Sequence, residues 1–378
     1  MKVLLASTGA DISSGAARCL IELAAKLIEN NIEVLVTIPK HGNIEKELLE
    51  KKIPYKYVHE YHSWYTSEKH KKNPFFIKKI LNYKCFLAFR KIIREERIDI
   101  VHENALTAYV AAWAAESLNV PVIWHIREFM EEDLKIRFYD RKKAIQIINK
   151  STHIIAISKA IYEKWSNIFA APMSVIYDGL PIENYYVERE WKIKKNEYTK
   201  IIIYGRIVEP KGQLFFVKAM KEVFSNCDRK IKCYLAGQVE DQVYFDKIND
   251  FIKDNKLNGC IEYLGQLDDM KKVLSNMDIV AICSQKEGFG RVTVEAMLAG
   301  CAVIGSDSGA TCELINDDVN GILYSQANVA DFAVKMKSLI NNPEYVQKIA
   351  RNAQLYALEN FSLNKNAENI IDIYKKYK

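Results

Sequence analysis

The stretch DIVAICSQKEGFGRVTVEAMLAGCAVIG, residues 278–305, contains a complete strand–helix–strand unit. Its two apolar runs, 278–283 and 301–305, are short and rich in β-branched residues, which predicts buried strands. A Gly-Phe-Gly turn separates the first run from 291–299, whose apolar spacing predicts a helix. Two buried strands joined by a helical crossover predict a parallel sheet with helices on both faces.

The same alternation of apolar runs and helical patterns continues along the whole chain. In the first half, the predicted strands are 2–7, 32–38, 98–102, 120–124 and 153–157. The helices predicted among them include 15–29, 77–96, 105–118 and 133–149. In the second half, the remaining strands are 200–204, 231–236, 260–264 and 322–324, with helices near 212–224, 241–255, 268–275 and 310–315. Two such blocks predict two tandem doubly wound, Rossmann-like α/β domains.

The pattern breaks once, at 178–197, where the chain loses its periodicity and becomes polar. We take this segment as the linker and predict an N-terminal domain at 1–184, a second domain at 185–360 and a C-terminal helix at 361–378. In open α/β sheets, ligands bind outside the carboxyl ends of the strands. Candidate site residues are therefore expected in the loops that follow the strands.

The composition is that of a globular protein of 378 residues with 49% hydrophobic residues and a net charge of +6. No run approaches the roughly 20 apolar residues of a membrane span, and the apolar start is too short for a signal peptide. The eight cysteines include no C-x-x-C pair, which favours reduced thiols over a disulfide framework. We expect a cytoplasmic protein.

The positive charge is concentrated between residues 51 and 100, where 13 Lys or Arg face 5 Asp or Glu. Within it, residues 69–97 alternate basic and apolar side chains at helical spacing. Such a helix can lie on an anionic membrane surface, which would make the protein peripheral on the inner face of the membrane. It can equally pack its apolar stripe on the core and leave its lysines in water. No recognition motif accompanies the charge, so nucleic acid is not an expected partner.

A glycine turn with two cations follows the strand predicted at 200–204. Arg206 and Lys211 lie five residues apart, directly before a predicted helix. Arg can grip two oxygens at once, Lys adds a mobile charge, and a helix start adds free amides. The loop therefore suits a diphosphate.

The loop that follows residues 278–283 carries two glutamates around a helix start. Glu295 can accept hydrogen bonds from two vicinal hydroxyls, or can simply favour the helix N-terminus. Helix chemistry does not explain Glu287, which precedes the glycine turn. The first helical amides, those of Arg291, Val292 and Thr293, are expected to be unpaired and open to an anion. An anion site between two hydroxyl-binding acids predicts a nucleotide sugar.

In the first half, His125 opens a polar quartet directly after the strand predicted at 120–124. We expect it at the ligand-binding edge, although a surface histidine paired with an acid is an alternative. Gly15, at a predicted helix start, is compatible with a nearby ligand and equally with an ordinary turn. No Asp-x-Asp pair or His/Cys set with metal-ligand spacing occurs, so no metal site is expected.

Taken together, these motifs resemble retaining glycosyltransferase family 4. The resemblance rests on the segments SQKEGFGRVTVEAMLAGCAVIGSDSGATCELI (284–315), YGRIVEPKG (204–212), VIYDGL (175–180), HIRE (125–128) and SSGAARCLIELAAKL (13–27). It implies the two-domain GT-B fold with an interdomain cleft. It also implies an acceptor-side N-terminal domain, a donor-binding second domain and a C-terminal helix that packs back on the N-terminal domain.

The resemblance also assigns roles at the donor phosphates and ribose. It implies that Arg206 and Lys211 bind the diphosphate and stabilise it as it leaves. The amide of Val292 would face the phosphate, and Glu295 would hold the ribose.

For the transferred sugar, the resemblance implies that Glu287 and the amides of Gly288, Phe289 and Gly290 bind its hydroxyls. His125 would meet the sugar from the N-terminal side. Gly15 would lie near the phosphate or the acceptor. Ser14-Gly15 stands where many family members have Gly-Gly, and this departure leaves the acceptor side open.

The implied activity is metal-independent, retaining hexosyl transfer from a nucleotide-diphosphate sugar to a glycan or lipid-linked acceptor, in bacterial surface polysaccharide synthesis. No cofactor is expected, and a UDP-sugar donor is favoured over a GDP-sugar. Two alternatives stay open: a nucleotide-sugar epimerase of the same fold, and a non-catalytic subunit that binds a nucleotide sugar.

Overall fold

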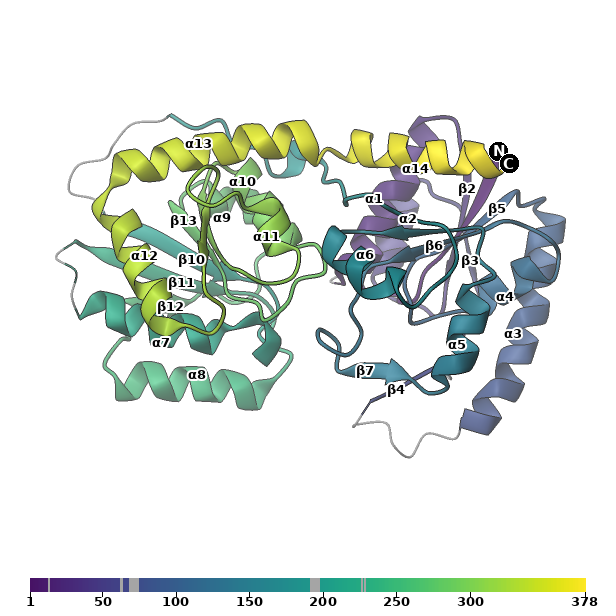
Figure 1. Ribbon diagram of the computed structural model, residues 1–378, viewed down its shortest axis with the longest axis horizontal. Coiled ribbons are helices and arrows are strands. Elements are labelled where there is room, and N and C mark those ends of the chain that lie inside the picture. The colour runs from purple at the N-terminus through teal and green to yellow at the C-terminus, as the bar shows by residue number, and fades with distance from the viewer. Residues whose placement is uncertain (13, 62–63, 68–74, 191–197, 226, 228) are drawn as a thin grey trace. The chain divides into compact units, whose positions relative to one another are not determined.

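The computed structural model of the chain describes residues 1–378 except 13, 62–63, 68–74, 191–197, 226 and 228. Residue contacts divide it into two compact units. The first unit comprises Met1–Gly179 with Leu363–Lys378, and the second comprises Leu180–Ser362. Each contains a parallel sheet with helices on both faces (Figure 1). The prediction of two doubly wound α/β blocks is confirmed.

The sheet of the first unit has seven parallel strands. In spatial order they are β3 (Tyr55–Tyr57), β2 (Glu33–Ile38), β1 (Lys2–Ala6), β5 (Ile100–Glu103), β6 (Val122–Ile126), β8 (His153–Ala156) and β9 (Met173–Val175). The helices are α1 (Gly15–Glu29), α2 (Ile44–Glu50), α3 (Phe75–Glu95), α4 (Val110–Glu116), α5 (Arg141–Ile148), α6 (Lys159–Ser166) and α14 (Leu363–Tyr377). The interior strand β1 pairs with β2 and β5, so Leu4 lies between Leu35 and Val101.

One face of this sheet is covered by α1, α2 and α14. Side chains such as Val3 and Leu5 of β1 pack there against Leu20 of α1 and Ile370 of α14, all almost fully buried. Helix α4 contacts β5 and β6 and packs against α3. The C-terminal residues 363–378 thus contribute to the same core as the first strand.

One predicted helix of the first unit is partly wrong. Residues 133–149 were expected to be helical, but Ile136–Phe138 form β7, which pairs antiparallel with β4 (Tyr65–Ser67). The helix α5 begins only at Arg141, where the Asp140 side chain accepts the Lys143 N–H as an N-cap. Pairing with a strand about 70 residues away overrides the local pattern, which periodicity alone does not show.

The second unit contains a six-stranded parallel sheet. In spatial order its strands are β12 (Ile261–Tyr263), β11 (Ile231–Ala236), β10 (Thr199–Tyr204), β13 (Ile279–Ile282), β14 (Ala302–Ser306) and β15 (Ile322–Tyr324). The helices are α7 (Gln213–Phe224), α8 (Gln242–Asp254), α9 (Met270–Leu274), α10 (Arg291–Leu298), α11 (Thr311–Leu314), α12 (Val329–Asn341) and α13 (Pro343–Asn360), with short 3₁₀ turns at Ile182–Asn184 and Glu209–Lys211.

Helices α7, α8 and α12 pack on one core of this unit, where Ile201 and Ile203 of β10 meet Phe216, Ile248 and Phe332. Helix α10 contacts β13 and β14, the two strands that flank it in sequence. The strand–helix–strand unit at 278–305 therefore forms as predicted, and its two strands are adjacent interior strands of the sheet.

Three observations bear on the expectations from composition. No helix in the described part of the chain is both long and apolar enough to cross a bilayer. All eight cysteines are free thiols. The residues described here include no cluster of three or more His, Cys, Asp or Glu that could hold a metal ion.

The predicted linker at 178–197 is only partly a connection between units. Residues from Leu180 onward belong to the second unit, and residues 191–197 lie outside the described residues. Arg189 binds the ends of two helices: it donates to the backbone carbonyls of Ala299, Ser275, Leu274 and Met277 at 2.7–3.0 Å. A guanidinium is suited to this because helix C-termini leave carbonyls without partners.

We predict that Arg189→Met lowers the free energy of unfolding by about 2–4 kcal/mol, since several partly buried carbonyls lose a charged donor. Thermal and urea unfolding of the full chain measure the loss. Arg189→Lys should lose about half as much, because an ammonium cannot reach all four carbonyls. Arg351→Met, at an exposed position of α13, is the matched control and should change stability by less than about 0.5 kcal/mol.

Candidate functional site

The loops after β10 and β13 bring two predicted site residues into contact. Lys211 Nζ lies 2.6 Å from Glu287 Oε1, and the Ser284 hydroxyl donates to the same oxygen. Burial alone would raise the pKa of Glu287. The charge and hydrogen bond of Lys211, with Ser284 and the charge of Arg206, outweigh burial and hold this pKa below its usual value of 4.5. The carboxylate is therefore ionised and paired.

The contact depends on a glycine that lets two backbones touch. Gly212 has a φ of +74°, and a Cβ there would lie 2.1 Å from the carbonyl oxygen of Cys283 at the end of β13. The neighbouring Gln285 N–H donates to the Pro210 carbonyl at 2.8 Å. Because no side chain fits between the loops, Lys211 is carried to within reach of Glu287.

The loop after β14 supports Glu287 from another direction. Gly309 has a φ of +55°, and a Cβ there would lie 2.7 Å from the Glu287 carbonyl oxygen. The Ala310 N–H donates to that oxygen at 2.9 Å, and the Ser308 hydroxyl donates to the Gln285 carbonyl. The loop at 306–313, to which the sequence assigned no role, fixes the backbone that carries Glu287.

Arg206 follows Gly205 at the end of β10, and about half of its side chain, 47%, is exposed to solvent. Its Nη1 lies 3.1 Å from Glu240 Oε2. A surface pair of this kind contributes only about 0–1 kcal/mol, so Arg206 can exchange Glu240 for another anion at little cost.

The start of α10 is set by Gly290, the N-cap, with a φ of +94°. Phe289 is buried and packs edge-to-face on Phe361 with ring centroids 5.7 Å apart, so its side chain anchors the turn. Val292 is the second helical residue, where a helix leaves its amide without an intrahelical acceptor. The expectation that the Thr293 amide is unpaired is wrong, because this N–H donates to the Gly290 carbonyl at 2.9 Å.

Glu295 is buried on α10 and has protein partners on both oxygens. The Tyr204 hydroxyl, at the end of β10, lies 3.1 Å from Oε2, and Arg291 Nε lies 3.8 Å from Oε1. Burial and the neighbouring carboxylate raise the pKa of Tyr204 well above its usual value, so the phenol remains a donor. Glu295 thus ties α10 to β10, and its ribose-binding role stays a prediction.

The two remaining predicted residues, His125 and Gly15, belong to the first unit. The expectation that His125 lies in a loop is wrong, because β6 extends to Ile126 and His125 is fully buried within it. The alternative of a surface histidine paired with an acid is also wrong, since its Nδ1 lies 3.1 Å from His102 Nε2 and 3.3 Å from Arg127 Nη2. Gly15 is the exposed first residue of α1, and a Cβ there would meet nothing within 4 Å.

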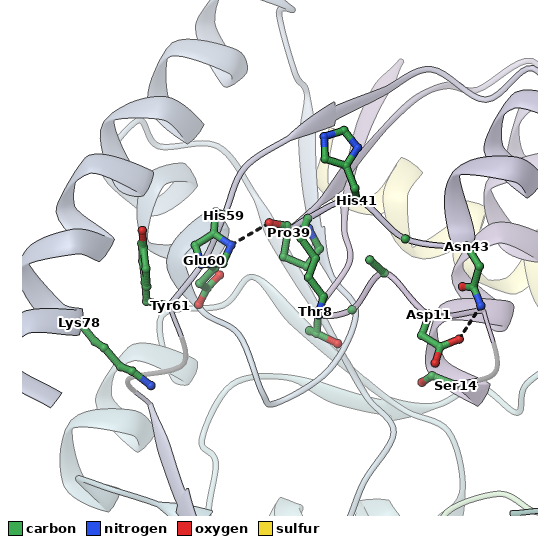
Figure 2. A pocket seen from close by; sticks show the side chains of 14 residues that line it. Thr8, Asp11, Ser14, Pro39, His41, Asn43, His59, Glu60, Tyr61 and Lys78 are labelled. Carbon is green, nitrogen blue, oxygen red and sulfur yellow. Dashed lines mark hydrogen bonds between the residues drawn. The ribbon is translucent and has the colours of Figure 1, made fainter. Parts of the chain in front are cut away.

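A cavity of the first unit lies where β1, β2 and β3 end, and it has a volume of about 650 Å³. Figure 2 shows its polar lining, in which Asn43 Nδ2 donates to Asp11 Oδ1 at 2.9 Å and His59 Nδ1 lies 2.9 Å from the Pro39 carbonyl. The lining residues are Thr8, Gly9, Ala10, Asp11, Ser14, Pro39, Lys40, His41, Gly42, Asn43, His59, Glu60, Tyr61 and Lys78.

Glu60 is the lining residue with the most perturbed ionisation. It accepts the backbone N–H groups of Tyr109 and Val110, at the start of α4, at 3.0 and 3.4 Å. Burial raises the pKa of Glu60 to about 7, although the two amides oppose the shift. The nearby Glu103 is fully buried, and burial and Glu60 raise its pKa well above its usual value.

Comparison with known proteins accounts for nearly the whole chain. Residues 13–184 match Glycosyltransferase Family 4, and residues 187–356 match Glycosyl transferases group 1. The chain belongs to glycosyltransferase family 4. This glycosyltransferase is therefore an enzyme, and each half of its chain matches a glycosyltransferase family.

For several relatives of the glycosyltransferase, the match covers most of the relative's own length. A glycosyltransferase of Methanocaldococcus jannaschii is 25% identical over 304 residues, which cover 75% of this chain and 77% of the relative. The GalNAc-alpha-(1->4)-GalNAc-alpha-(1->3)-diNAcBac-PP-undecaprenol alpha-1,4-N-acetyl-D-galactosaminyltransferase of Campylobacter jejuni is 21% identical over 279 residues, covering 72% and 73%. HepE of Anabaena, solved with UDP and glucose, has a TM-score of 0.81, 22% identity and full coverage of both chains. The structural likeness shows a shared GT-B fold.

Sequence reasoning missed several residues at the two candidate sites. Ser284 and Tyr204 each lie at the end of a strand, directly before a motif, so their position was a usable signal. Glu60 follows the short strand β3, which the sequence pattern did not predict. Glu240 lies 34 residues from Arg206, and nothing local indicates their pairing.

We predict that Glu60→Gln changes how stability depends on pH. Folded Glu60 keeps its proton up to about pH 7, whereas the unfolded carboxyl releases it near pH 4.5, so the folded state binds more protons in between. The wild-type free energy of unfolding therefore falls as the pH rises through this window. Glu60→Gln removes this contribution, and its melting temperature relative to wild type should rise from about pH 5 to pH 8.

The control for this experiment is Glu33→Gln, an exposed position at the start of β2. Its melting temperature relative to wild type should be the same at both ends of the pH range. A Glu60→Gln curve parallel to that of wild type would contradict the prediction.

Proposed function

We propose that this glycosyltransferase moves a sugar from a nucleotide-diphosphate sugar to a glycan or lipid-linked acceptor in bacterial surface polysaccharide synthesis. The observation that carries the proposal is the ionised Lys211–Glu287 pair beside the start of α10. It places a cation, a hydroxyl acceptor and helix-start amides at the carboxyl ends of two adjacent strands. A sugar diphosphate needs these three groups.

In this proposal the diphosphate is bound by Arg206, Lys211 and the amide of Val292. As the bond between the sugar and the phosphate oxygen breaks, the leaving group gains negative charge. Cations placed there stabilise the transition state more than the bound substrate, and this difference lowers the barrier. Arg206 becomes available by releasing Glu240.

The transferred sugar is bound by Glu287 and the backbone of Gly288, Phe289 and Gly290. The ribose is bound by Glu295. A new bond forms between the anomeric carbon and the acceptor oxygen on the face that the diphosphate leaves. The acceptor proton passes to the leaving phosphate oxygen, so the configuration is retained and no metal takes part. A UDP-sugar is favoured over a GDP-sugar, which the complex of the similar HepE with UDP supports.

For the acceptor side, we assign the 650 Å³ cavity of the first unit, together with His125 and Gly15. Ser14, beside Gly15, lines the cavity. Asp11, Asn43 and Glu60 offer donors and acceptors of the kind that sugar hydroxyls need. The mixed lining of Lys40, Lys78 and carboxylates fits a polar glycan better than an apolar ligand.

We expect one of a panel of UDP-, GDP- and ADP-sugars to raise the melting temperature of the enzyme. A ligand at about 100 times its Kd adds roughly 2.7 kcal/mol to the free energy of unfolding. Lys211→Met should strongly reduce this shift, because the diphosphate loses one of its two cations. Lys218→Met, an exposed position of α7, should retain it.

Product analysis of the same samples separates the competing activities. Incubation with the donor alone should yield no isomerised sugar. An isomerised sugar would indicate an epimerase. Absence of a shift with every nucleotide sugar would contradict the proposed donor class. Binding without transfer to any polysaccharide or lipid-linked acceptor would favour a non-catalytic subunit.

The exposed face of α3 supports a membrane-bound setting for the acceptor. Helix α3 buries Phe86 and Phe89 in the core, so the packing interpretation holds for one side. The other side exposes a continuous stripe, apolar at first and basic toward the end of the helix: Ile77, Ile80, Tyr83, Lys84, Leu87, Lys91 and Arg94. Of the predicted segment 69–97, residues 69–74 lie outside the described residues. We propose that this stripe lies on an anionic membrane surface.

We expect the protein to co-sediment with phosphatidylglycerol vesicles and much less with phosphatidylcholine vesicles. Ile80→Glu with Leu87→Glu should weaken binding at least about tenfold, since each apolar side chain contributes about 1.5–3 kcal/mol when buried. Val243→Glu, at an equally exposed apolar position of α8, should bind as wild type does. Equal binding to both kinds of vesicle, or none, would contradict the proposal.

A further inference from the structure

Three buried rings connect the C-terminal helix to β6 inside the first unit. The Tyr374 hydroxyl of α14 lies 2.6 Å from His102 Nδ1 of β5. His102 Nε2 lies 3.1 Å from His125 Nδ1. All three side chains are 0% exposed. The chain of contacts begins 272 residues away from His102 in sequence and ends on a predicted site residue.

Arg127 is one of two groups that set which nitrogen of His125 carries the proton, and His102 is the other. A guanidinium can only donate hydrogen bonds, and Arg127 Nη2 lies 3.3 Å from His125 Nδ1, so this nitrogen is an acceptor. Burial, with the charge of Arg127, holds the pKa of His125 well below its usual range. A neutral imidazole has one N–H, which must therefore be at Nε2 of His125.

The same reasoning extends to His102 and Tyr374. Because His125 Nδ1 is an acceptor, His102 Nε2 must donate to it. Burial and the charge of Arg127 lower the pKa of His102 to about 3, so its ring is neutral and its Nδ1 is an acceptor. Burial raises the pKa of Tyr374, which keeps its hydroxyl protonated and able to donate. The hydrogen bonds thus run in one direction, from Tyr374 through His102 to His125.

Arg127 is itself held in place by a buried ion pair. Its Nη1 lies 2.6 and 2.7 Å from the two oxygens of Asp178, and its Nε donates to Asn104 Oδ1 at 2.8 Å. Both members of the pair are almost fully buried. Arg127, which shares His125 Nδ1 with His102, therefore has little freedom to turn away.

The donor at the end of this chain has no acceptor. His125 Nε2 is buried and has no hydrogen-bond partner among the residues that the structure describes. A buried N–H without a partner costs about 1–3 kcal/mol. Native proteins rarely leave such a group unsatisfied, and contact with a substrate is one explanation for an exception.

We propose that Tyr374 and His102 are positioning residues, which hold His125 as the Nε2–H tautomer so that it donates a hydrogen bond to an oxygen of the carbohydrate substrate. The proposal rests on the proposed function for its substrate. Because the His125 ring is fully buried, contact with the substrate requires the residues around Nε2 to move. The C-terminal helix then contributes a hydrogen bond to the site as well as apolar packing.

The test is Tyr374→Phe, which keeps the ring in the core and removes only the donor. Long-range ¹H–¹⁵N spectra of protein with ¹⁵N-labelled histidine report which nitrogen is protonated, and His125→Gln assigns the signals. At pH 7 the wild type should show His102 and His125 with unprotonated Nδ1. In Tyr374→Phe, His102 Nδ1 loses its donor and can carry the proton itself, and His102 Nε2 then becomes an acceptor that competes with Arg127 for His125 Nδ1. A second tautomer of His102 and His125 should therefore appear, and kcat/KM for sugar transfer should fall about tenfold.

The same helix offers a matched control. Tyr377 is also on α14, and its hydroxyl lies 3.2 Å from His153 Nδ1, while His153 Nε2 lies 2.8 Å from the Ser174 hydroxyl. Tyr377→Phe therefore removes a second tyrosine–histidine bond that does not lead to His125. It should leave the His125 signals and kcat/KM as in wild type.

Unchanged His125 signals in Tyr374→Phe would overturn the proposal. Equal losses of kcat/KM in Tyr374→Phe and Tyr377→Phe, in step with melting temperature, would also overturn it, because both bonds would then serve stability alone. If the wild type transfers no sugar from any donor, the proposed function fails. The tautomer spectra, recorded without substrate, still decide the roles of Tyr374 and His102.

Discussion

Backbone contact among three loops is the constraint on which the second unit depends. The chain after β10 touches the end of β13 at Gly212, and the chain after β14 touches Glu287 at Gly309. Neither contact has room for a Cβ, so only glycine permits these close backbone approaches. Lys211 and Glu287 are consequently held within hydrogen-bond distance before any ligand arrives. A charged group that is already in place does not have to be reorganised during the reaction.

The two units use burial in opposite ways. In the second unit, Glu287 is ionised because Lys211 and Ser284 compensate for its loss of water. In the first unit, burial keeps His102 and His125 neutral. A neutral imidazole has a defined donor and a defined acceptor, whereas a charged one has two donors. A chain of neutral rings therefore has one fixed direction of hydrogen-bond donation, whereas Lys211 and Glu287 offer a cation to an anion and an acceptor to hydroxyls.

The C-terminal helix joins these features to the fold. Helix α14 fills the same core as β1 and α1 with Ala367 and Ile370, and it carries two tyrosines that each meet a histidine of the sheet. Apolar burial accounts for the docking of the helix. The two hydroxyls differ in what they contact, because only that of Tyr374 is connected through His102 to His125.

The sequence by itself determined the α/β class, the positions of most strands and the loops that carry Arg206, Lys211 and Glu287. These features are local: a strand or helix appears in the spacing of apolar residues, and strand ends identify the ligand-binding edge. Tertiary structure alone decided that Lys211 meets Glu287 across 76 residues, that residues 136–138 form a strand with β4, and that His125 is buried in β6. Those outcomes depend on contacts between distant segments, and no periodicity records which distant side chain or backbone will be the neighbour.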